Sequence, residues 1–499
     1  MKMNVPRTLV AGLVLMIAVA ARATALVADP VEGRWYGTAG AVGNESPFGL
    51  EIRTDGKGGF DSLLYLEVMS YFGEALPRMQ REGSRYEIPD LALVLTLDGD
   101  RLAGTLGKAP VSLGRVETLP KEAPVPVDLP TGPPPLWRTA LGAAIYAAPA
   151  VRDGMAYVGT AGGVLSAVKI SDGSFAWTFS AGRPIMGEAL VTDDALFFVC
   201  DNGFLYRLAR SSGKEVWRYD LGDAQSARIL PHSVVYDYDH ESPRPVLADG
   251  AIFVGSGDAS FHAVDAATGQ RRWRVAVKGK VRSTALALGP NVIFGTWGGE
   301  LHAANRATGK DVWLKDLKGP VTSTPAIVGA RLVVGTRGSA LLALVPETGE
   351  TAWTMGFWGS WVESTAVQGD DGLGYIGSSD LRRVLCFDPK DGRIVWRTDV
   401  YGAPWGKPLL TDMYVYDGAS AIVPYMTRHA GGLVAIERKT GKLAWRFPLT
   451  NPPGTLHYGF AGSPTRAGEV FLIGGMDGAL YAFPLGDRAP NGTGPEGQS

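Results

Sequence analysis

Four of the 13 tryptophans lie in loop-like segments rather than in strand-like runs: Trp297, Trp358, Trp361 and Trp405. Aromatic side chains that core packing does not require indicate a surface for a ligand or a partner. The alternative is that these rings fill an interior space. The sequence leaves both interpretations open.

Five charged residues occupy equivalent places, each shortly before a short apolar run: Glu188, Arg244, Arg282, Glu363 and Lys407. Mixed charges gathered in a low-dielectric funnel could hold a polar or anionic ligand, because such a funnel concentrates the field. They could equally be solvated loop ends, and the pattern does not separate the two.

One acidic segment, residues 236–241, is rich in oxygen ligands of the kind that Ca²⁺ prefers. Its candidate ligands are Asp237, Asp239 and Glu241. The segment has no glycine-containing ligand loop of fixed spacing, which favours a solvated loop over a metal site. His262 and His302 fall within strand-like runs and are expected in the core. No phosphate-binding loop, zinc motif or nucleophile elbow is present.

A Gly-x-x-x-Trp motif recurs seven times and organises the chain around these residues. Successive motif tryptophans are 40, 56, 40, 40, 43 and 49 residues apart: Trp177, Trp217, Trp273, Trp313, Trp353, Trp396 and Trp445. Each unit contains short alternating runs separated by Asp-Gly or Thr-Gly turns, which are hairpin signals. The repeat therefore predicts four-stranded antiparallel sheets arranged as the blades of a β-propeller.

Trp137 indicates how the ring closes. It begins a strand-like run, 136–141, with no preceding turn, whereas the last unit, 462–485, ends without a tryptophan strand. We therefore expect residues 136–141 to supply the outer strand of the last blade, which gives eight blades. An open seven-blade array would leave a long exposed edge.

The irregular residues of the repeat are predicted to share one face. The longest spacings place insertions at about 223–242 and 417–431. By strand order, both insertions and the four loop tryptophans open on the same side, together with four histidines: His232, His240, His429 and His457. This face is the candidate binding face, although the rings could instead plug a wide central channel.

The pattern of residues 261–273, Phe-His-Ala-Val-Asp-Ala-Ala-Thr-Gly followed by Trp273, resembles the pyrroloquinoline-quinone (PQQ) repeat. This resemblance covers about residues 136–486 and implies an eight-bladed propeller. The repeat builds quinoprotein alcohol dehydrogenases and also the BamB family, non-catalytic propellers of outer-membrane assembly. Dehydrogenases of that family have longer insertions and an adjacent Cys-Cys pair, whereas Cys200 and Cys386 lie in opposite blades here. We predict two free, buried thiols, because a disulfide needs Cα atoms within about 7 Å.

The remaining segments have different compositions. Residues 1–25 resemble a secretory signal peptide without a lipidation cysteine, and their apolar run is too short to span a bilayer. Residues 30–118 predict a small antiparallel β domain, and its Gly-x-Trp-x-Gly opening resembles that of lipocalins. A proline-rich linker is expected at 119–135 and a disordered tail at 487–499.

These observations favour a periplasmic or secreted scaffold that resembles the BamB family more than the dehydrogenases. Its protein or peptide partner in the cell envelope would dock on the Trp-rich face. The alternative is a PQQ- and Ca²⁺-dependent dehydrogenase of alcohols or sugars, with Glu188, Glu363 or Asp237 as metal ligand or general base. Polysaccharide or small-molecule binding by residues 30–118 is a third hypothesis. With 48 Lys+Arg against 50 Asp+Glu, the chain has no basic excess for nucleic acid. No transmembrane segment is expected in the mature chain.

Overall fold

A computed structural model of the full chain describes residues 29–40, 45–67, 71–121, 129–224, 228, 238–422, 430–450 and 456–486. The predicted leader and tail lie outside these residues, as do His232, Asp237 and His429. The described residues form strands and one 3-10 turn, η2 (Pro89–Leu91), in two units, 1–123 and 124–499. Within these ranges, no helix is long and apolar enough to cross a membrane.

The first unit is a curled, antiparallel sheet of nine strands. In sheet order its strands are β4 (Tyr71–Ala75), β3 (Phe60–Leu66), β2 (Ser46–Thr54), β1 (Gly33–Ala39), β9 (Ala109–Val116), β8 (Arg101–Leu106), β7 (Leu93–Asp98), β6 (Arg85–Ile88) and β5 (Gln80–Glu82). A bridge between Phe60 and Met79 brings the start of β3 beside the start of β5. Trp35 is fully buried inside this sheet and donates its indole N–H to the carbonyl of Val31 at 2.8 Å.

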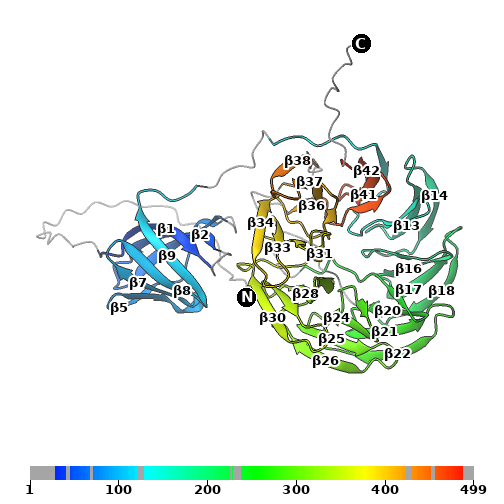
Figure 1. The fold of residues 1–499 in the computed structure, drawn as a ribbon, viewed down its shortest axis with the longest axis horizontal. Helices are drawn as coiled ribbons and strands as arrows, with labels where there is room; N and C mark the ends of the chain where they lie inside the picture. Colours follow the sequence, from blue (N-terminus) through cyan, green and yellow to red (C-terminus); the bar gives the residue numbers. More distant parts are fainter. Residues whose placement is uncertain are drawn as a thin grey trace, which may run out of the picture. The chain divides into compact units, whose positions relative to one another are not determined.

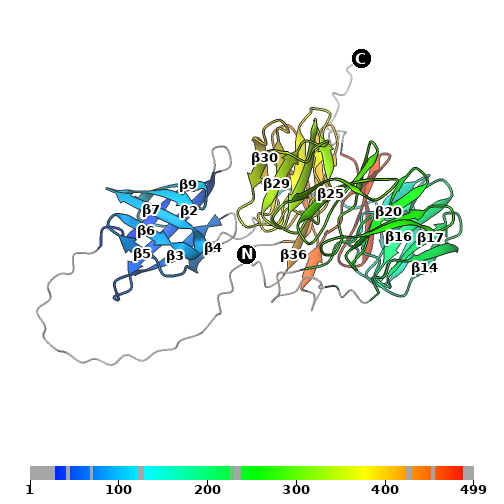
Figure 2. The same cartoon turned by 90° about the horizontal axis from the view of Figure 1, so that it is seen from below.

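The second unit is an eight-bladed propeller, as predicted, with blades arranged around one axis (Figures 1 and 2). Blades 1 to 4 are β11 (Ala150–Arg152), β12 (Met155–Gly159), β13 (Val164–Lys169), β14 (Phe175–Ser180); β15 (Leu190–Val191), β16 (Ala195–Cys200), β17 (Phe204–Ala209), β18 (Glu215–Asp220); β19 (Val246–Ala248), β20 (Ala251–Gly255), β21 (Ser260–Asp265), β22 (Arg271–Ala276); and β23 (Leu286–Leu288), β24 (Asn291–Gly295), β25 (Glu300–Asn305), β26 (Asp311–Asp316).

Blades 5 to 8 complete the ring. They are β27 (Ala326–Val328), β28 (Arg331–Thr336), β29 (Ala340–Leu344), β30 (Thr351–Gly356); β31 (Val367–Gln368), β32 (Gly374–Gly377), β33 (Arg383–Phe387), β34 (Ile394–Asp399); β35 (Leu409–Leu410), β36 (Tyr414–Ile422), β37 (Gly432–Glu437), β38 (Leu443–Pro448); and β40 (Thr465–Ala467), β41 (Val470–Gly474), β42 (Ala479–Pro484), β10 (Trp137–Ala140). Blade 7 gains a fifth strand, β39 (His457–Gly459), which pairs with the end of β36.

The repeated glycine and tryptophan contact each other across neighbouring blades. The turn glycine of one blade lies on the indole of the blade before it, so that a Cβ on Gly309 would lie 2.8 Å from Cε3 of Trp273. Gly309 also has a φ of +72°, which favours glycine. The Trp273 indole N–H donates to the carbonyl of Arg306 at 2.9 Å. The motif therefore joins each blade to the next.

The ring closes as predicted, because β10 pairs with β42 from Trp137↔Ala482 to Ala140↔Ala479.

The end of the proline-rich segment differs from the free linker that we expected. Gly132 lies on the indole of Trp445, as the turn glycines of the other blades lie on the tryptophan of the preceding blade. The backbone N–H of Arg446 in β38 donates to the carbonyl of Pro130 at 2.8 Å, and the N–H of Gly132 donates to the carbonyl of Arg446 at 2.9 Å. Residues 130–132 thus pack on blade 7, because that blade's tryptophan has no following Gly turn to cover it.

The core positions expected from sequence are buried. Cys200 and Cys386 are free, buried thiols, as predicted. His262 and His302 are 1% and 5% exposed within the blades, also as predicted.

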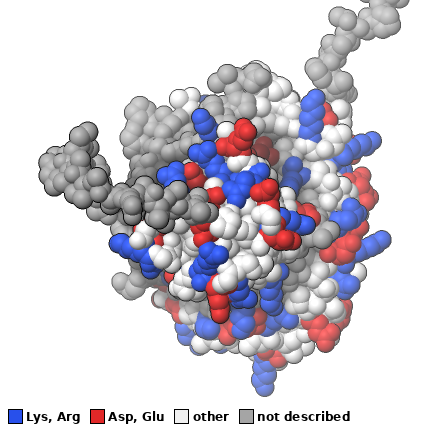
Figure 3. Space-filling model, turned by 90° about the vertical axis from the view of Figure 1, so that its left-hand side faces the viewer, with Lys and Arg blue, Asp and Glu red and all other residues white. Residues whose placement is uncertain are grey.

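On the face shown in Figure 3, basic and acidic side chains are interspersed rather than separated into patches of one sign.

Candidate functional site

The propeller encloses a cavity of about 600 Å³ that is lined by segments of all eight blades where the chain enters the inner strands. The inner strands lie nearest to the axis of a propeller, so the cavity occupies the central channel. Six of the nine predicted binding residues line it: Glu188, Arg244, Arg282, Glu363, Lys407 and Trp405. The equivalent places in the repeat therefore do converge in space.

The polar wall of the cavity contains one partly exposed ion pair. Arg244 Nε lies 3.1 Å from Glu188 Oε1, and about a third of each side chain is exposed. Burial raises the pKa of Glu188, while the charges of Arg244 and Lys407 oppose that shift. Lys407 itself is exposed. This wall therefore presents both charges to solvent.

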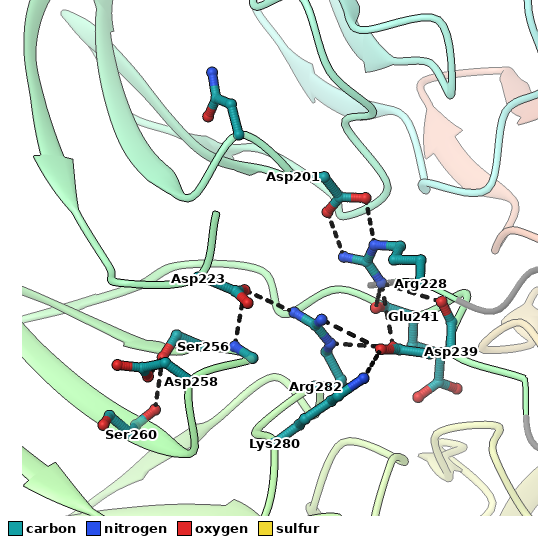
Figure 4. A network of polar contacts seen from close by, with 12 residues as sticks. Asp201, Asp223, Arg228, Asp239, Glu241, Ser256, Asp258, Ser260, Lys280 and Arg282 are labelled. Atoms are coloured by element: carbon teal, nitrogen blue, oxygen red, sulfur yellow. Dashed lines mark hydrogen bonds and ion pairs between the residues drawn. The ribbon is translucent and has the colours of Figure 1, made fainter. Parts of the chain in front are cut away.

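Arg282 belongs to a buried ionic network rather than to a solvated loop end (Figure 4). Its guanidinium contacts Asp239 at 3.1 and 3.2 Å and Asp223 at 3.0 Å. Lys280 Nζ lies 2.8 Å from the second oxygen of Asp239. Burial alone would raise the pKa of Asp239, but the charges of Arg282 and Arg228 outweigh it and lower that pKa.

Arg228, a residue of the 223–242 insertion, contacts both Asp201 of blade 2 and Asp239. Its Nη2 lies 2.6 Å from Asp201, and its Nη1 lies 3.3 Å from Asp239 and contacts the carbonyl of Glu241 (Figure 4). Both oxygens of Asp239 thus neutralise buried cations. Asp239, a candidate calcium ligand in the sequence, thus uses its carboxylate here in ion pairs with Arg228, Lys280 and Arg282.

Trp297 and Trp361 hold an arginine between them. The guanidinium carbon of Arg337 lies 4.5 Å from the Trp297 ring centre and 4.2 Å from that of Trp361. Arg337 also contacts Glu363 Oε1 through Nε at 2.8 Å and Nη2 at 2.6 Å. Cation–π contacts of a desolvated guanidinium contribute about 2 kcal/mol. These two tryptophans therefore position a buried Arg–Glu pair.

Trp405 is 7% exposed and packs against two histidines. The ring centroids of His240 and Trp405 lie 4.5 Å apart in a stacked arrangement with an interplanar angle of 30°. The ring centroid of His457 lies 5.4 Å from that of Trp405 in an edge-on arrangement. The indole N–H of Trp405 donates to Ser379 Oγ at 3.0 Å. Burial lowers the pKa of both histidines to about 3, so both rings are neutral at pH 7.

Trp358 is the fourth loop tryptophan. It lies in the connection before blade 6 with a φ of +54°, and like Trp297 and Trp361 it is half-buried and does not line the cavity. Three of the four rings thus pack within the molecule, against Arg337 or against His240 of the 223–242 insertion.

Comparison with known proteins supports the assignment made from the repeat. A family model described as outer membrane protein assembly factor BamB matches residues 127–229, 201–296, 285–359 and 347–488. These matches together cover more than half of the chain. The chain belongs to the BamB family.

Curated relatives in this family are distant. BamB of Yersinia pestis is 26% identical over 143 residues, which are 28% of this chain and 35% of that protein. BamB of Shewanella oneidensis is 24% identical over 121 residues, 24% of this chain and 28% of that protein. The chain thus spans about a third of the length of the curated relatives that it matches.

Solved structures show the same fold at low identity. BamB from Moraxella catarrhalis superposes with a TM-score of 0.53 at 18% identity, covering 72% of this chain and 99% of that one. Quinohemoprotein alcohol dehydrogenase from Comamonas testosteroni superposes with a TM-score of 0.56 at 16% identity, covering 73% and 78%. Similarity at this level shows the propeller fold that the BamB family shares with these enzymes, and the fold alone does not assign an activity.

Arg337 is the residue of the candidate site that the sequence analysis missed. In this BamB-family chain, Thr296-Trp297-Gly298 and Thr336-Arg337-Gly338 occupy the same place after the second strand of adjacent blades, 40 residues apart. Equivalent places in neighbouring blades lie side by side around the axis. The repeat register therefore carried the signal that Trp297 and Arg337 would meet.

Proposed function

We propose that the protein is an exported, non-catalytic scaffold for the assembly of outer membrane proteins. The observation that carries this proposal is the BamB family match, which runs through all eight blades from residue 127 to residue 488. In this proposal, a leader at residues 1–25 directs export and the mature chain acts in the periplasm.

The partner is proposed to dock on the face where the channel cavity opens. Two features support this choice. Lys407 is exposed, and the Glu188–Arg244 pair is partly exposed, so the cavity wall offers charges that a polar peptide can pair with. Trp358 on a nearby connection offers a half-buried aromatic surface. An extended segment of an envelope protein with an acidic residue suits this mixture, because Lys407 adds a positive charge to a paired wall.

PQQ does not fit against Trp297, Trp361 or Trp405. A flat quinone needs an accessible aromatic face. Here Arg337 lies on a face of both Trp297 and Trp361, and His240 stacks on Trp405, which is 7% exposed. A quinone stacked on these rings would compete with side chains that are already packed there. These three rings therefore do not support the dehydrogenase alternative.

Site-specific photo-cross-linking in intact cells tests the docking face. A benzoylphenylalanine at Lys407 is compared with one at Lys310, an exposed lysine in the turn after the third strand of blade 4, which opens on the opposite face. Cross-links from position 407, but not from 310, to an outer-membrane assembly protein would support the proposal. Cross-links from 310 alone would place the docking face on the other side, and none from either would contradict a scaffold role.

A separate measurement tests the enzymatic alternative. The purified mature chain is titrated with PQQ in the presence of Ca²⁺ while tryptophan fluorescence is followed, and dye reduction is then assayed with alcohols and sugars. We expect neither saturable quenching nor dye reduction. Saturable quenching that is lost in Trp405→Ala would overturn the non-catalytic assignment.

A further inference from the structure

We propose that His240, Glu241 and Glu363 form a binding site for one divalent transition-metal ion in the channel cavity. One ring nitrogen and one oxygen from each carboxylate all lie within 4.8 Å of one another. A metal with ligand distances of about 2.1 Å holds its donors roughly 3 to 4 Å apart. The observed spacing therefore needs only small side-chain rotations to close around an ion.

Each of the three residues has a buried polar atom that no hydrogen bond satisfies among the described residues. These atoms are His240 Nδ1, Glu241 Oε2 and Glu363 Oε2. His240 and Glu363 are only 4% and 3% exposed, so solvent does not replace the missing partners. A buried acceptor without a partner costs about 1–3 kcal/mol, and more when it is charged. Coordination of a cation would remove this cost for all three residues at once.

The surrounding side chains hold two of the three ligands in place. The stacking of His240 on Trp405 fixes the plane of the imidazole, and the Ser379 hydroxyl fixes Trp405 in turn. Arg337 donates a hydrogen bond to Oε1 of Glu363, and Oε2 of that carboxylate accepts none from the described residues, which leaves it for the metal. Such support of ligands by a second layer of contacts is typical of metal sites. The packed tryptophans thus acquire a role as positioning residues.

The donor set selects the class of metal. One imidazole nitrogen with two carboxylates suits Zn²⁺, Mn²⁺ or Fe²⁺, whereas Ca²⁺ and Mg²⁺ prefer oxygen ligands alone. Burial and the neighbouring Glu363 both raise the pKa of Glu241, and a divalent cation held between the two carboxylates would offset both effects. Since all three residues line the cavity, an ion has a path of entry and retains coordination positions that face the channel.

Calorimetric titration of the untagged, chelator-treated full chain with ZnCl₂ tests the site. We expect one Zn²⁺ per chain with micromolar or tighter affinity, a raised Tm on binding, and no comparable heat from CaCl₂ or MgCl₂. Glu241→Gln should weaken Zn²⁺ binding at least tenfold. Glu188→Gln is the matched control, because this carboxylate lines the same cavity but pairs with Arg244, and it should leave Zn²⁺ affinity unchanged.

A second variant keeps the test decisive if Glu241→Gln fails to fold. His240→Phe preserves the ring on Trp405 and removes both imidazole nitrogens, so it should abolish the visible absorption of bound Co²⁺ while retaining the folded propeller. Equal Zn²⁺ binding by the two variants and the unmodified chain would overturn the proposal, since other histidines would then be responsible. Binding of Ca²⁺ as tight as that of Zn²⁺ would overturn the proposed metal class.

Discussion

Asp239→Asn is the substitution that most directly tests how the insertion is anchored. Asp239 is 1% exposed, and its two oxygens face Arg282 and Lys280 at 2.8 to 3.2 Å. Arg228 approaches the same carboxylate at 3.3 Å. The amide has nearly the same shape but no charge, so three cations would lose their shared counter-ion while the packing stays almost unchanged.

The expected cost follows from the burial of this network. Removing one partner of a buried ion pair lowers stability by about 3–5 kcal/mol, because the remaining charge stays desolvated. With a guanidinium slope of about 5 kcal/mol per molar, the midpoint should fall by about 0.6–1 M. Twelve of the 13 tryptophans lie in the propeller, so intrinsic fluorescence reports its unfolding.

Asp316→Asn provides the matched control. Asp316 makes a 2.6 Å ion pair with Lys318, but both side chains are at least half exposed. Exposed pairs contribute little, so this variant should unfold at the same midpoint as the unmodified chain. If Asp239→Asn were no less stable than Asp316→Asn, the network would not anchor the insertion and our reasoning about it would fail.

Three further predictions follow from other parts of the chain. Burial raises the pKa of Cys200 to about 11 and of Cys386 to about 12, so neither thiol should react with Ellman's reagent at pH 8 until denaturant exposes two per chain; rapid reaction of the folded protein would contradict this. Burial lowers the pKa of His457 to about 3, so between pH 6.5 and pH 3 this imidazole is protonated in the unfolded state but not in the folded state. The free energy of unfolding should therefore fall by about 1.4 kcal/mol for each pH unit below about 6.5 on account of this group. His457→Phe should flatten that slope, and an unchanged pH profile from urea denaturation would refute the assignment. Gly132→Ala places a Cβ 2.2 Å from the indole beneath it and should speed proteolysis within 129–135, whereas Gly356→Ala, with open space around it, should not.

The sequence was sufficient for the propeller because its blades depend on local and repeated contacts. A glycine turn and the tryptophan of the preceding blade recur at fixed spacing, and that pair is the joint between blades, as Gly309 on Trp273 shows. Strand closure by residues 136–141 followed from the same register. The first unit was harder to predict, because β4 and β5 are short and have no buried residue, and they lack an alternating apolar pattern.

The candidate site was only partly predictable, for a physical reason. Register predicted that Glu188, Arg244, Arg282, Glu363 and Lys407 would converge, and all five line the cavity. The register of the repeat could not predict which side chains these five residues would contact, because several of those partners lie in the 223–242 insertion, which has no counterpart in the other blades. Asp239 and His240 therefore changed roles once their neighbours were known, from loop residues to an ionic anchor and a stacked ring.

The position after the second strand explains why the insertion has so many partners. Asp201, Trp297 and Arg337 occupy this place in blades 2, 4 and 5, where the chain turns over the channel. Asp201 contacts Arg228 of the insertion, and the two others contact each other. An eight-bladed ring leaves a wide channel that small inner-strand residues do not fill. Because Arg228, Asp239 and these loop residues connect several blades through ion pairs and cation–π contacts, and Arg337 pairs with Glu363 of the cavity wall, a change there should alter blade-to-blade cohesion and ligand access together. Stability must therefore be measured beside binding for every variant of this channel.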